Sequence, residues 1–391
     1  MKNFIYHIPT KIAFGEGQIE NLPQLITPYG KKVLLLYGGG SIKKNGIYDR
    51  AIQLLTEEGI EVTELGGVEP NPQIATVRKG VELCKKGGIE VVLPIGGGSV
   101  IDCAKAIAVG VYYDKDPWDL VLNNSLITQA LPIVSVLTVA ATGSEMDASS
   151  VISNSETNQK LEIFSDKVFP KASILDPSYT CSVPAYQTAA GVADIMSHVF
   201  EYYFSGDKIL QIQRDMMNSI LRTCVTYGPI AIKNPECEEA RANLMWAASW
   251  AINGFISGGA DSCWPCHAME YQLTNRYHVT HGHGMAIIDY AWMRYILSDK
   301  TEADFVEYGT RVWDIDPKLP TGEIAQTAIL RTGEFYESLG LTLTLTSIGA
   351  ADPLVLPDMA RQCQEEFALN EADTLGLEEA EILAIYESCY S

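Results

Sequence analysis

Basic side chains are scarce in this sequence. Lysine and arginine together number 28, against 49 aspartates and glutamates, and the formal net charge is −21. Nucleic acids and anionic membranes bind proteins through clustered lysines and arginines that neutralise phosphate groups. The charge balance therefore argues against both as partners of this chain.

Long apolar runs are missing as well. Residues 1–9 lack the apolar stretch of a signal peptide, and the longest apolar stretch, near residues 131–141, is too short to cross a bilayer. The nine cysteines are an odd number scattered along the chain, which fits reduced thiols better than a disulfide framework. These absences predict a cytoplasmic protein.

The chain is long enough for two globular domains. Its 391 residues exceed the size at which one hydrophobic core keeps growing, and 47% hydrophobic with 20% charged residues is an ordinary globular composition. The first half alternates β-branched runs with helical patterns. Strands are expected at residues 32–37, 61–65, 89–95, 133–137 and 172–175, and helices at 47–58, 74–86 and 100–109. This rhythm predicts a parallel sheet with helices on both faces.

Different patterns precede and follow this α/β region. Residues 4–6 and 11–14, split by Pro9, suggest an edge hairpin at the start. After Pro177 the periodicity becomes helical, at residues 215–226, 238–253 and 324–339, with no convincing strand between these segments. We place the boundary between Pro177 and Pro184, and predict a dinucleotide-binding α/β domain over 1–182 and a helical domain over 183–391.

Two glycine-rich turns point to a nucleotide. Gly96, Gly97 and Gly98 join the strand at 89–95 to the next helix, where bare amides and the helix dipole favour a pyrophosphate. The alternative is a tight structural turn. A second run, Gly38 to Gly40 followed by Ser41, closes the earlier strand. Neither turn has the Gly-x-Gly-x-x-Gly spacing of the usual dinucleotide fingerprint.

The second turn also bears on the choice of nucleotide. A dinucleotide fold normally presents an Asp or Glu there to the adenosine ribose, and residues 37–41 contain no carboxylate. Ser41, Lys43 and Lys44 leave room and donors for a 2′-phosphate, although the two lysines could be plain solvated side chains. The sequence therefore favours NADP(H) over NAD(H).

Histidine is scarce too, yet four of the six histidines fall between His267 and His283. Asp194 and His198 stand four residues apart in a predicted helix over 191–201, so both share one face. Such a pair alone is more often an intrahelical hydrogen bond. If one straight helix ran from His267 to His281, its ends would be about 21 Å apart at ~1.5 Å per residue. The chain must therefore turn back near residues 277–280 for these histidines to share an ion.

With that turn, one carboxylate and three histidines, Asp194, His198, His267 and His281, suit Zn²⁺ or Fe²⁺ with an open position for a substrate oxygen. His278 is expected to be structural or at the surface, His283 could line the site, and His7 is assigned no role. The Cys-x-x-Cys-His run that ends at His267 matches haem attachment and thioredoxin-type patterns. The missing export signal and the size of the domain argue against both, which leaves packing roles and a place for Cys266 beside the site.

Several motifs in order resemble the iron-containing alcohol dehydrogenase family, within it the NADPH-dependent butanol dehydrogenase and aldehyde reductase branch. They are Gly96-Gly97-Gly98-Ser99-x-x-Asp102-x-x-Lys105, Ala141-Thr142-Gly143-Ser144-Glu145-Met146, Ser173-Ile174-Leu175-Asp176-Pro177, Gly191-x-x-Asp194-x-x-x-His198 and His281-Gly282-x-Gly284. The resemblance implies an N-terminal nucleotide domain, a helical metal domain, a cleft between them and a homodimer. It implies metal ligands at the four positions above. Cofactor contacts are implied at Gly38, Gly39, Ser41, Gly97, Gly98, Ser99, Asp102, Thr138, Thr142, Lys160 and Tyr179, with Asp102 near the phosphates or the nicotinamide.

Two departures from the family pattern touch the expected chemistry. Tyr271 stands four residues after His267, where the family commonly has another histidine, and a tyrosine titrates far higher. Asp147 stands where this branch commonly has Asn, which would place an extra negative charge near the nicotinamide.

The expected reaction interconverts primary alcohols and aldehydes, as in a butanol dehydrogenase or broad aldehyde reductase. The cation would polarise the carbonyl while the nicotinamide delivers hydride, with a proton from water, His283 or Tyr271. Two alternatives remain. A lyase or synthase of the dehydroquinate synthase type would need several basic residues, and only Arg276 is basic between residues 254 and 285. A non-catalytic metal-binding protein is the other.

Overall fold

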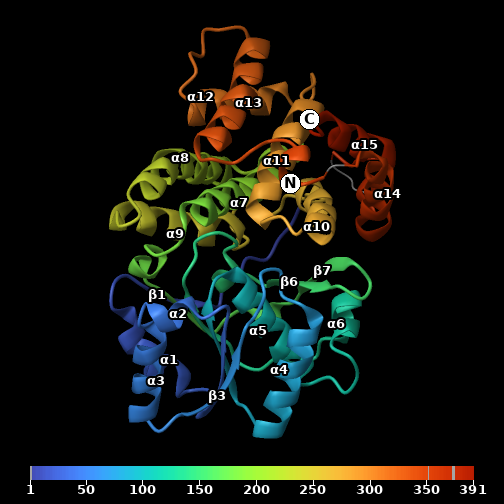
Figure 1. Cartoon of the computed structure of the whole chain (residues 1–391). Coiled ribbons are helices and arrows are strands. Elements are labelled where there is room, and N and C mark those ends of the chain that lie inside the picture. The colour runs from blue at the N-terminus through green and yellow to red at the C-terminus, as the bar shows by residue number, and fades with distance from the viewer. Residues whose placement is uncertain (1, 351, 372–374) are drawn as a thin grey trace. The chain divides into compact units, whose positions relative to one another are not determined.

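The computed structural model describes residues 2–350, 352–371 and 375–391, which form two compact units (Figure 1). The α/β unit comprises His7–Val183 and Glu236–Ser249. The helical unit comprises residues 2–6, Pro184–Pro235 and the described part of Trp250–Ser391. The main boundary between the units thus falls between Val183 and Pro184. Residues 2–6, before it, belong to the helical unit, and Glu236–Ser249, after it, belong to the α/β unit.

A six-stranded parallel sheet forms the centre of the α/β unit, in the order β1-β8-β5-β4-β2-β3. Its strands are β1 Lys11–Phe14, β2 Lys32–Tyr37, β3 Glu61–Gly66, β4 Val91–Gly96, β5 Val134–Leu137 and β8 Ala172–Leu175. The predicted strand positions and the predicted parallel pairing are both confirmed.

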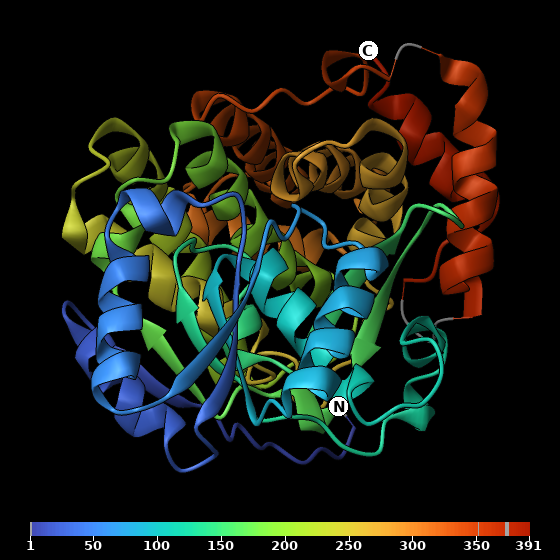
Figure 2. The same cartoon turned by 60° about the horizontal axis from the view of Figure 1, so that its bottom comes forward.

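Apolar residues on both faces of the sheet explain why helices cover each side. Along β2, Leu34 and Leu36 pack in the core with α4 (Ile74–Gly87) and α5 (Gly98–Gly110). Val33 and Leu35, which point the opposite way, pack with α1 (Leu22–Ile26) and α3 (Ile47–Glu57). Figures 1 and 2 show these two helix pairs on opposite faces of the sheet.

The N-terminal segment differs from the prediction. The expected edge hairpin is wrong, because β1 pairs in parallel with β8 and residues 3–10 form no strand. Residues 2–6 instead belong to the helical unit, where the backbone N–H of Lys2 donates to the carbonyl of Gly259 at 2.8 Å. An antiparallel hairpin does occur elsewhere, in β6 (Ser149–Asn154) and β7 (Gln159–Phe164), where the sequence pattern predicted none.

The helical unit is built around two long helices. These are α7 (Ala185–Tyr203) and α11 (His281–Ile296), which pack against each other, while α8 (Gln211–Lys233) packs on α7 and α10 (Pro265–Tyr277) on α11. The other helices of this unit are α12 Glu302–Val312, α13 Thr321–Ser338, α14 Leu356–Phe367 and α15 Glu379–Ser388. The described residues of this unit contain no strand, as predicted. Stacked Phe204 and Phe305, with ring centroids 4.2 Å apart, lie in its core.

Three further α-helices of the described residues are α2 Ser41–Lys44, α6 Trp118–Leu122 and α9 Glu238–Ile252. Residues of α9 up to Ser249 belong to the α/β unit. Among the described residues, no helix is both long and apolar enough to cross a membrane.

Candidate metal centre and nucleotide-binding turns

A tight reversal between two helices brings the histidines together. Helix α10 ends at Tyr277, and His278 follows in the left-handed conformation, φ 53°, with its N–H donating to the carbonyl of Thr274 at 3.0 Å. Helix α11 begins at His281. The predicted turn near residues 277–280 is confirmed, and His278 is exposed at the end of the helix, as expected.

Glycines allow α11 to lie close to its neighbours. A Cβ at Gly282 would collide with the carbonyl group of Ala190 on α7, so only glycine permits this approach of the two helices. A Cβ at Gly284 would lie 2.7 Å from Oε1 of Glu270 on α10. The His-Gly-x-Gly pattern therefore packs the start of α11 against both helices that carry the other candidate ligands.

The four candidate metal ligands gather at this point. Single ligand atoms of Asp194, His267 and His281 all lie within 4.8 Å of one another. The Oδ1 atom of Asp194 lies 3.5 Å from Nε2 of His281 and 3.8 Å from Nε2 of His198. The ring of His198 stacks on that of His267 at a centroid distance of 5.0 Å. Three helices thus bring one carboxylate and three imidazoles to one place.

Two further carboxylates, which the sequence analysis missed, hold two of these imidazoles. Oε1 of Glu201 lies 2.8 Å from Nδ1 of His267, and Oε2 of Glu270 is hydrogen-bonded to Nδ1 of His281. A carboxylate accepts the Nδ1–H hydrogen, so Nε2 of each ring is left with its lone pair.

The residues present fit a divalent cation. Asp194 Oδ1 is buried and accepts no hydrogen bond from the described residues, although a buried carboxylate oxygen ordinarily has a partner. Carboxylate oxygen and imidazole nitrogen are ligands that Zn²⁺ and Fe²⁺ accept. The buried oxygen and the outward lone pairs of two imidazoles are therefore consistent with a metal site.

The two candidate proton donors occupy different surroundings. The ring of Tyr271 lies 5.9 Å from that of His281 and 6.4 Å from that of His267, and its side chain is 9% exposed. Both ring nitrogens of His283 are engaged: Nδ1 lies 3.0 Å from the Tyr186 hydroxyl, and Nε2 lies 3.0 Å from the Thr342 carbonyl. Burial also lowers the pKa of His283.

All nine cysteines are free thiols, in line with the expectation of a reduced chain. Cys266 is fully buried next to His267 at the start of α10, and Cys263 is partly buried. Burial raises the pKa of Cys263 to about 12, and that of Cys266 well above its usual range. Such thiols are poor nucleophiles, which agrees with the rejection of a thioredoxin-type role.

In the α/β unit, both glycine turns follow strands directly, as predicted. Strand β4 ends at Gly96, Gly97 precedes α5, and a Cβ at Gly98 would collide with the side chain of Thr142. At the other turn, a Cβ at Gly39 would meet nothing within 4 Å. Three residues of the implied cofactor set, Gly38, Gly97 and Thr138, follow the carboxyl ends of the adjacent strands β2, β4 and β5. That edge of a parallel sheet is where nucleotides bind.

The other implied cofactor contacts are scattered over this unit. The N–H of Thr138 donates to the carbonyl of Gly96 at 2.9 Å, which ties the two strand ends together. Lys160 is buried on β7, Tyr179 lies in a short turn after β8, and Ser99 Oγ lies 3.4 Å from the backbone N of Asn71. Burial raises the pKa of Tyr179 to about 12.

Asp102 and Asp147 lie in one polar cluster. Asp102 accepts hydrogen bonds from Ser144 Oγ at 2.6 Å and from the backbone N–H of Val151 at 3.1 Å, and burial raises its pKa to about 6. Lys105 is fully buried and bonds to the Asp147 carboxylate. The extra negative charge expected from Asp147 is therefore paired with Lys105.

A carboxylate also stands near the second glycine turn, where the sequence analysis found none. Glu64, on the neighbouring strand β3, accepts hydrogen bonds from the hydroxyls of Tyr37 at 3.0 Å and Tyr48 at 2.6 Å. Lys43 Nζ lies 3.5 Å from the same carboxylate and over both tyrosine rings, at 4.6 and 4.3 Å from their centroids. The sequence alone could not place Glu64 beside Lys43, because helix α3 separates the two residues along the chain.

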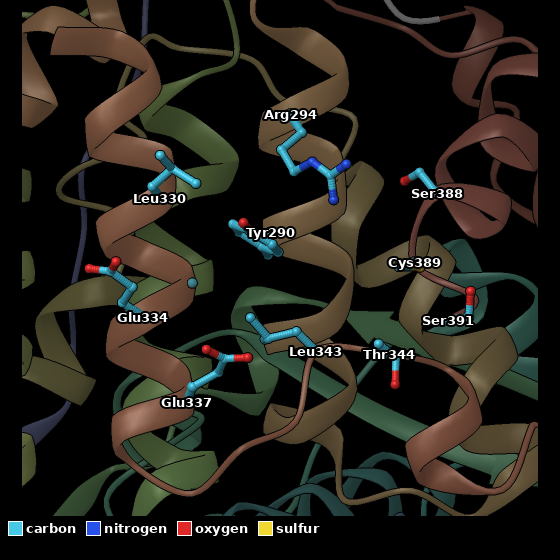
Figure 3. A pocket seen from close by; sticks show the side chains of 11 residues that line it. Tyr290, Arg294, Leu330, Glu334, Glu337, Leu343, Thr344, Ser388, Cys389 and Ser391 are labelled. Carbon is cyan, nitrogen blue, oxygen red and sulfur yellow. The ribbon is translucent and has the colours of Figure 1, made fainter. Parts of the chain in front are cut away.

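A separate groove of about 240 Å³ lies in the helical unit (Figure 3). Tyr290 and Arg294 of α11 face Leu330 and Glu337 of α13 across it. None of the candidate metal ligands or proton donors lines this groove.

Comparisons with known proteins agree with this assignment. The model of the family described as "Iron-containing alcohol dehydrogenase" matches residues 9–177, and that of "Fe-containing alcohol dehydrogenase family, C-terminal" matches residues 188–390. NADH-dependent butanol dehydrogenase A of Clostridium acetobutylicum is 51% identical over 395 residues, covering 100% of both chains. NADPH-dependent aldehyde reductase YqhD of Escherichia coli is 37% identical, covering 93% of this chain and 94% of its own.

A solved structure gives the same result. The crystal structure of NADH-dependent butanol dehydrogenase A from Thermotoga maritima has a TM-score of 0.94 and 36% identity, covering 100% of this chain and 99% of its own. Both the fold and the sequence are thus matched over essentially the whole chain. The chain therefore belongs to the iron-containing alcohol dehydrogenase family and is a metal-dependent, NAD(P)-dependent alcohol and aldehyde oxidoreductase.

Proposed function

We propose that this enzyme interconverts short primary alcohols and aldehydes, with one Fe²⁺ or Zn²⁺ held by Asp194, His198, His267 and His281. The observation that carries the proposal is the group of ligand atoms from Asp194, His267 and His281 within 4.8 Å of one another. Several similar proteins are named butanol dehydrogenases, which supports a four-carbon or similar substrate. We assign metal and substrate to the helical domain, 183–391, and the nucleotide to residues 1–182.

The chain's own residues contribute position, charge and a proton. When bound, the cation would stabilise negative charge on the substrate oxygen, and the nicotinamide would give or accept hydride. Glu201 and Glu270 hold the ligand imidazoles in one orientation. The Tyr271 hydroxyl is the candidate proton donor, because its ring lies beside those of two candidate ligands. We place Asp102, which accepts a hydrogen bond from Ser144 Oγ, near the phosphates or the nicotinamide.

The nucleotide would contact the strand-end turns of the α/β unit. The contacts we propose are Gly38, Gly39, Ser41, Gly97, Gly98, Ser99, Asp102, Thr138, Thr142, Lys160 and Tyr179. Gly39 offers open space, and the amides at the start of α5 suit a pyrophosphate.

The preference for NADP(H) over NAD(H) stays a prediction, and the local charges weaken it. Lys43, the side chain that would bind a 2′-phosphate, is already paired with Glu64. Relatives at 51% and 53% identity are named NADH-dependent, whereas the one at 37% is named NADPH-dependent. We therefore propose that Glu64 sets the balance, because its carboxylate repels a 2′-phosphate and occupies the lysine.

A substitution at Glu64 tests this role. Glu64→Gln removes the charge but keeps the hydrogen-bond acceptor for Tyr37 and Tyr48. KM for NADPH should fall about tenfold while KM for NADH changes little, because Lys43 is freed for the phosphate. Glu61→Gln, at the exposed start of the same strand, is the matched control. An unchanged ratio of the two KM values would rule out Glu64 as the determinant.

The proposed activity is tested with a panel of short aldehydes and alcohols, using NADH and NADPH, in the presence of Fe²⁺, Zn²⁺ or a chelator. We expect metal-dependent oxidation of the reduced nucleotide by aldehydes. Metal binding without turnover of any aldehyde would instead support a non-catalytic metal-binding protein or a lyase of the dehydroquinate synthase type.

We also propose that the enzyme is a homodimer that acts in the cytoplasm, as the family resemblance suggests. Sedimentation of the full chain would give twice the monomer mass of 42.8 kDa if this is right, and the monomer mass if it is wrong.

A further inference from the structure

The sequence around the metal centre contains the same spacing twice. Glu201 follows His198 by three residues on α7, and Glu270 follows His267 by three residues on α10. Residues three apart on a helix lie on one face, so each glutamate points to the same side as the histidine that precedes it. The corresponding position after His281 on α11 is Gly284, which has no side chain.

Each glutamate holds a candidate ligand histidine that lies on a different helix. Oε1 of Glu201 on α7 lies 3.0 Å from the backbone N and 2.8 Å from Nδ1 of His267 on α10. Glu270 on α10 in turn bonds to Nδ1 of His281 on α11, and its Oε1 accepts from the Thr274 hydroxyl. The two His-x-x-Glu segments therefore link α7 to α10 and α10 to α11.

Both carboxylates lie where an ionised group is costly. Glu201 is 1% exposed and Glu270 is fully buried. With Asp194, 2% exposed, they place three carboxyl groups around two imidazoles. A buried carboxylate is destabilising unless hydrogen bonds and a positive charge compensate for it. A divalent cation at the Nε2 atoms would supply that charge.

We propose that Glu201 and Glu270 are the positioning residues of the metal centre. Each carboxylate fixes the tautomer and direction of one ligand imidazole, so that Nε2 of His267 and of His281 faces the cation. This inference rests on the proposed metal site and extends it to two residues that do not themselves bind the ion. It assigns the buried negative charge to the metal-binding apparatus rather than to the packing of the unit.

Two kinds of substitution separate orientation from charge. Glu201→Ala and Glu270→Ala remove the acceptor for Nδ1–H, and metal affinity should fall by about 10–100-fold, as is usual when such a partner of a ligand histidine is lost. In Glu201→Gln and Glu270→Gln the side-chain carbonyl can still accept that hydrogen. Affinity should therefore fall less in the Gln variants than in the Ala variants.

Gly284 provides a variant that alters no hydrogen-bonding group. A Cβ there would lie 2.7 Å from Oε1 and 2.8 Å from Cγ of Glu270, which is held between Thr274 and His281. Gly284→Ala must therefore displace the carboxylate of Glu270. Metal affinity should fall in this variant as well, by less than in Glu270→Ala.

Asp289→Asn is the matched control. Asp289 is a fully buried carboxylate on α11, but it accepts from Ser197 Oγ at 2.9 Å and from the Tyr336 hydroxyl at 3.3 Å rather than from a ligand imidazole. If the loss of any buried carboxyl group weakened metal binding, this variant would change it as much as the glutamate variants do.

The experiment uses the full chain and two readouts. Zn²⁺ affinity is measured by competition with a chelating dye, and the ligand geometry by the visible absorption bands of bound Co²⁺. We expect weaker Zn²⁺ binding and shifted Co²⁺ bands in the Glu201, Glu270 and Gly284 variants, and neither change in Asp289→Asn. Circular dichroism identifies any variant that does not fold, and the Gln and Gly284 variants then decide.

Failure of the inference differs from failure of the proposed function. If the wild-type chain binds neither Zn²⁺ nor Co²⁺, the proposed metal site is wrong and the inference falls with it. If the wild type binds both ions but the folded variants bind them as tightly and with the same Co²⁺ spectrum, only the positioning role is overturned. Equal losses in Asp289→Asn would also overturn it.

Discussion

In the α/β unit most of the candidate contacts lie in the turns that follow β2, β4 and β5, which places backbone amides and glycines at one edge of the sheet. In the helical unit the candidate ligands are side chains of α7, α10 and α11, and two of them are oriented by carboxylates of other helices. One site therefore depends on where the strands end, and the other on contacts between side chains that are distant in sequence. Local sequence patterns reveal the first kind far better than the second.

The two units also use buried charge differently. In the α/β unit, Lys105 is fully buried and bonds to the Asp147 carboxylate, with a further bond of 2.7 Å to the Ser149 carbonyl, so the chain supplies both charges. In the helical unit, Glu201 and Glu270 face imidazoles that are candidate metal ligands. Removal of a charged group should therefore cost folding stability in the first unit and metal affinity in the second.

The largest effect on stability is expected for Lys105→Ala. This change leaves Asp147 ionised, buried and without its cation, and should lower the free energy of unfolding by about 3–5 kcal/mol. Lys43→Ala, at an exposed ion pair that water and salt screen, should lower it far less. Urea unfolding followed by fluorescence compares the two. Similar losses in both variants would show that the buried pair contributes no more than a surface pair.

A pH-dependent effect is expected at Glu145, a fully buried carboxyl that accepts from Ser249 Oγ. Burial raises its pKa from 4.5 to about 7, so the folded chain binds this proton more tightly than the unfolded chain. Its contribution to stability therefore falls as the pH rises from about 4.5 to about 7, by on the order of 3 kcal/mol. Glu145→Gln stays neutral, so it should stabilise the protein relative to wild type at about pH 8 more than at about pH 5. An equal difference at both pH values would contradict the raised pKa.

A smaller and selective effect is expected for Gly98→Ala. The added Cβ collides with Thr142, so the start of α5 must shift, at a cost of about 1–3 kcal/mol. NADH and NADPH should bind about tenfold more weakly, while Zn²⁺ affinity stays unchanged. Gly87→Ala, where the Cβ would make only ordinary contacts from 3.4 Å outward, is the control. Loss of Zn²⁺ affinity in Gly98→Ala would contradict separate sites in the two units.

Much of the fold could be predicted from local patterns. Strand β2 is a run of apolar residues closed by glycines, and its predicted bounds match the structure. The hairpin of β6 and β7 was not predicted, because Ser149, Ser150 and Ser153 give β6 little strand character. Strand β6 is stabilised by its antiparallel pairing with β7. The N-terminal hairpin failed for the opposite reason, since Phe14 and its neighbours pair in parallel with a distant strand.

The candidate site was predictable only in part. Asp194 and His198 follow from helix spacing, and the turn between His267 and His281 from the length of a helix. Glu201 and Glu270 could not be assigned, because each stands three residues from one histidine and bonds to another. Their His-x-x-Glu spacing was visible in the sequence, but the partners depend on how three helices pack.

The central claim is that metal and nucleotide are bound by separate units, and the metal content of His267→Ala tests it most directly. The variant and the wild type are loaded with Zn²⁺, dialysed and analysed for bound metal, and their NADH and NADPH affinities are measured by fluorescence titration. We predict one ion per wild-type chain, none in the variant, no aldehyde reduction by the variant, and equal nucleotide affinities. A folded variant that retains its metal, or that loses nucleotide binding together with the metal, would contradict this account.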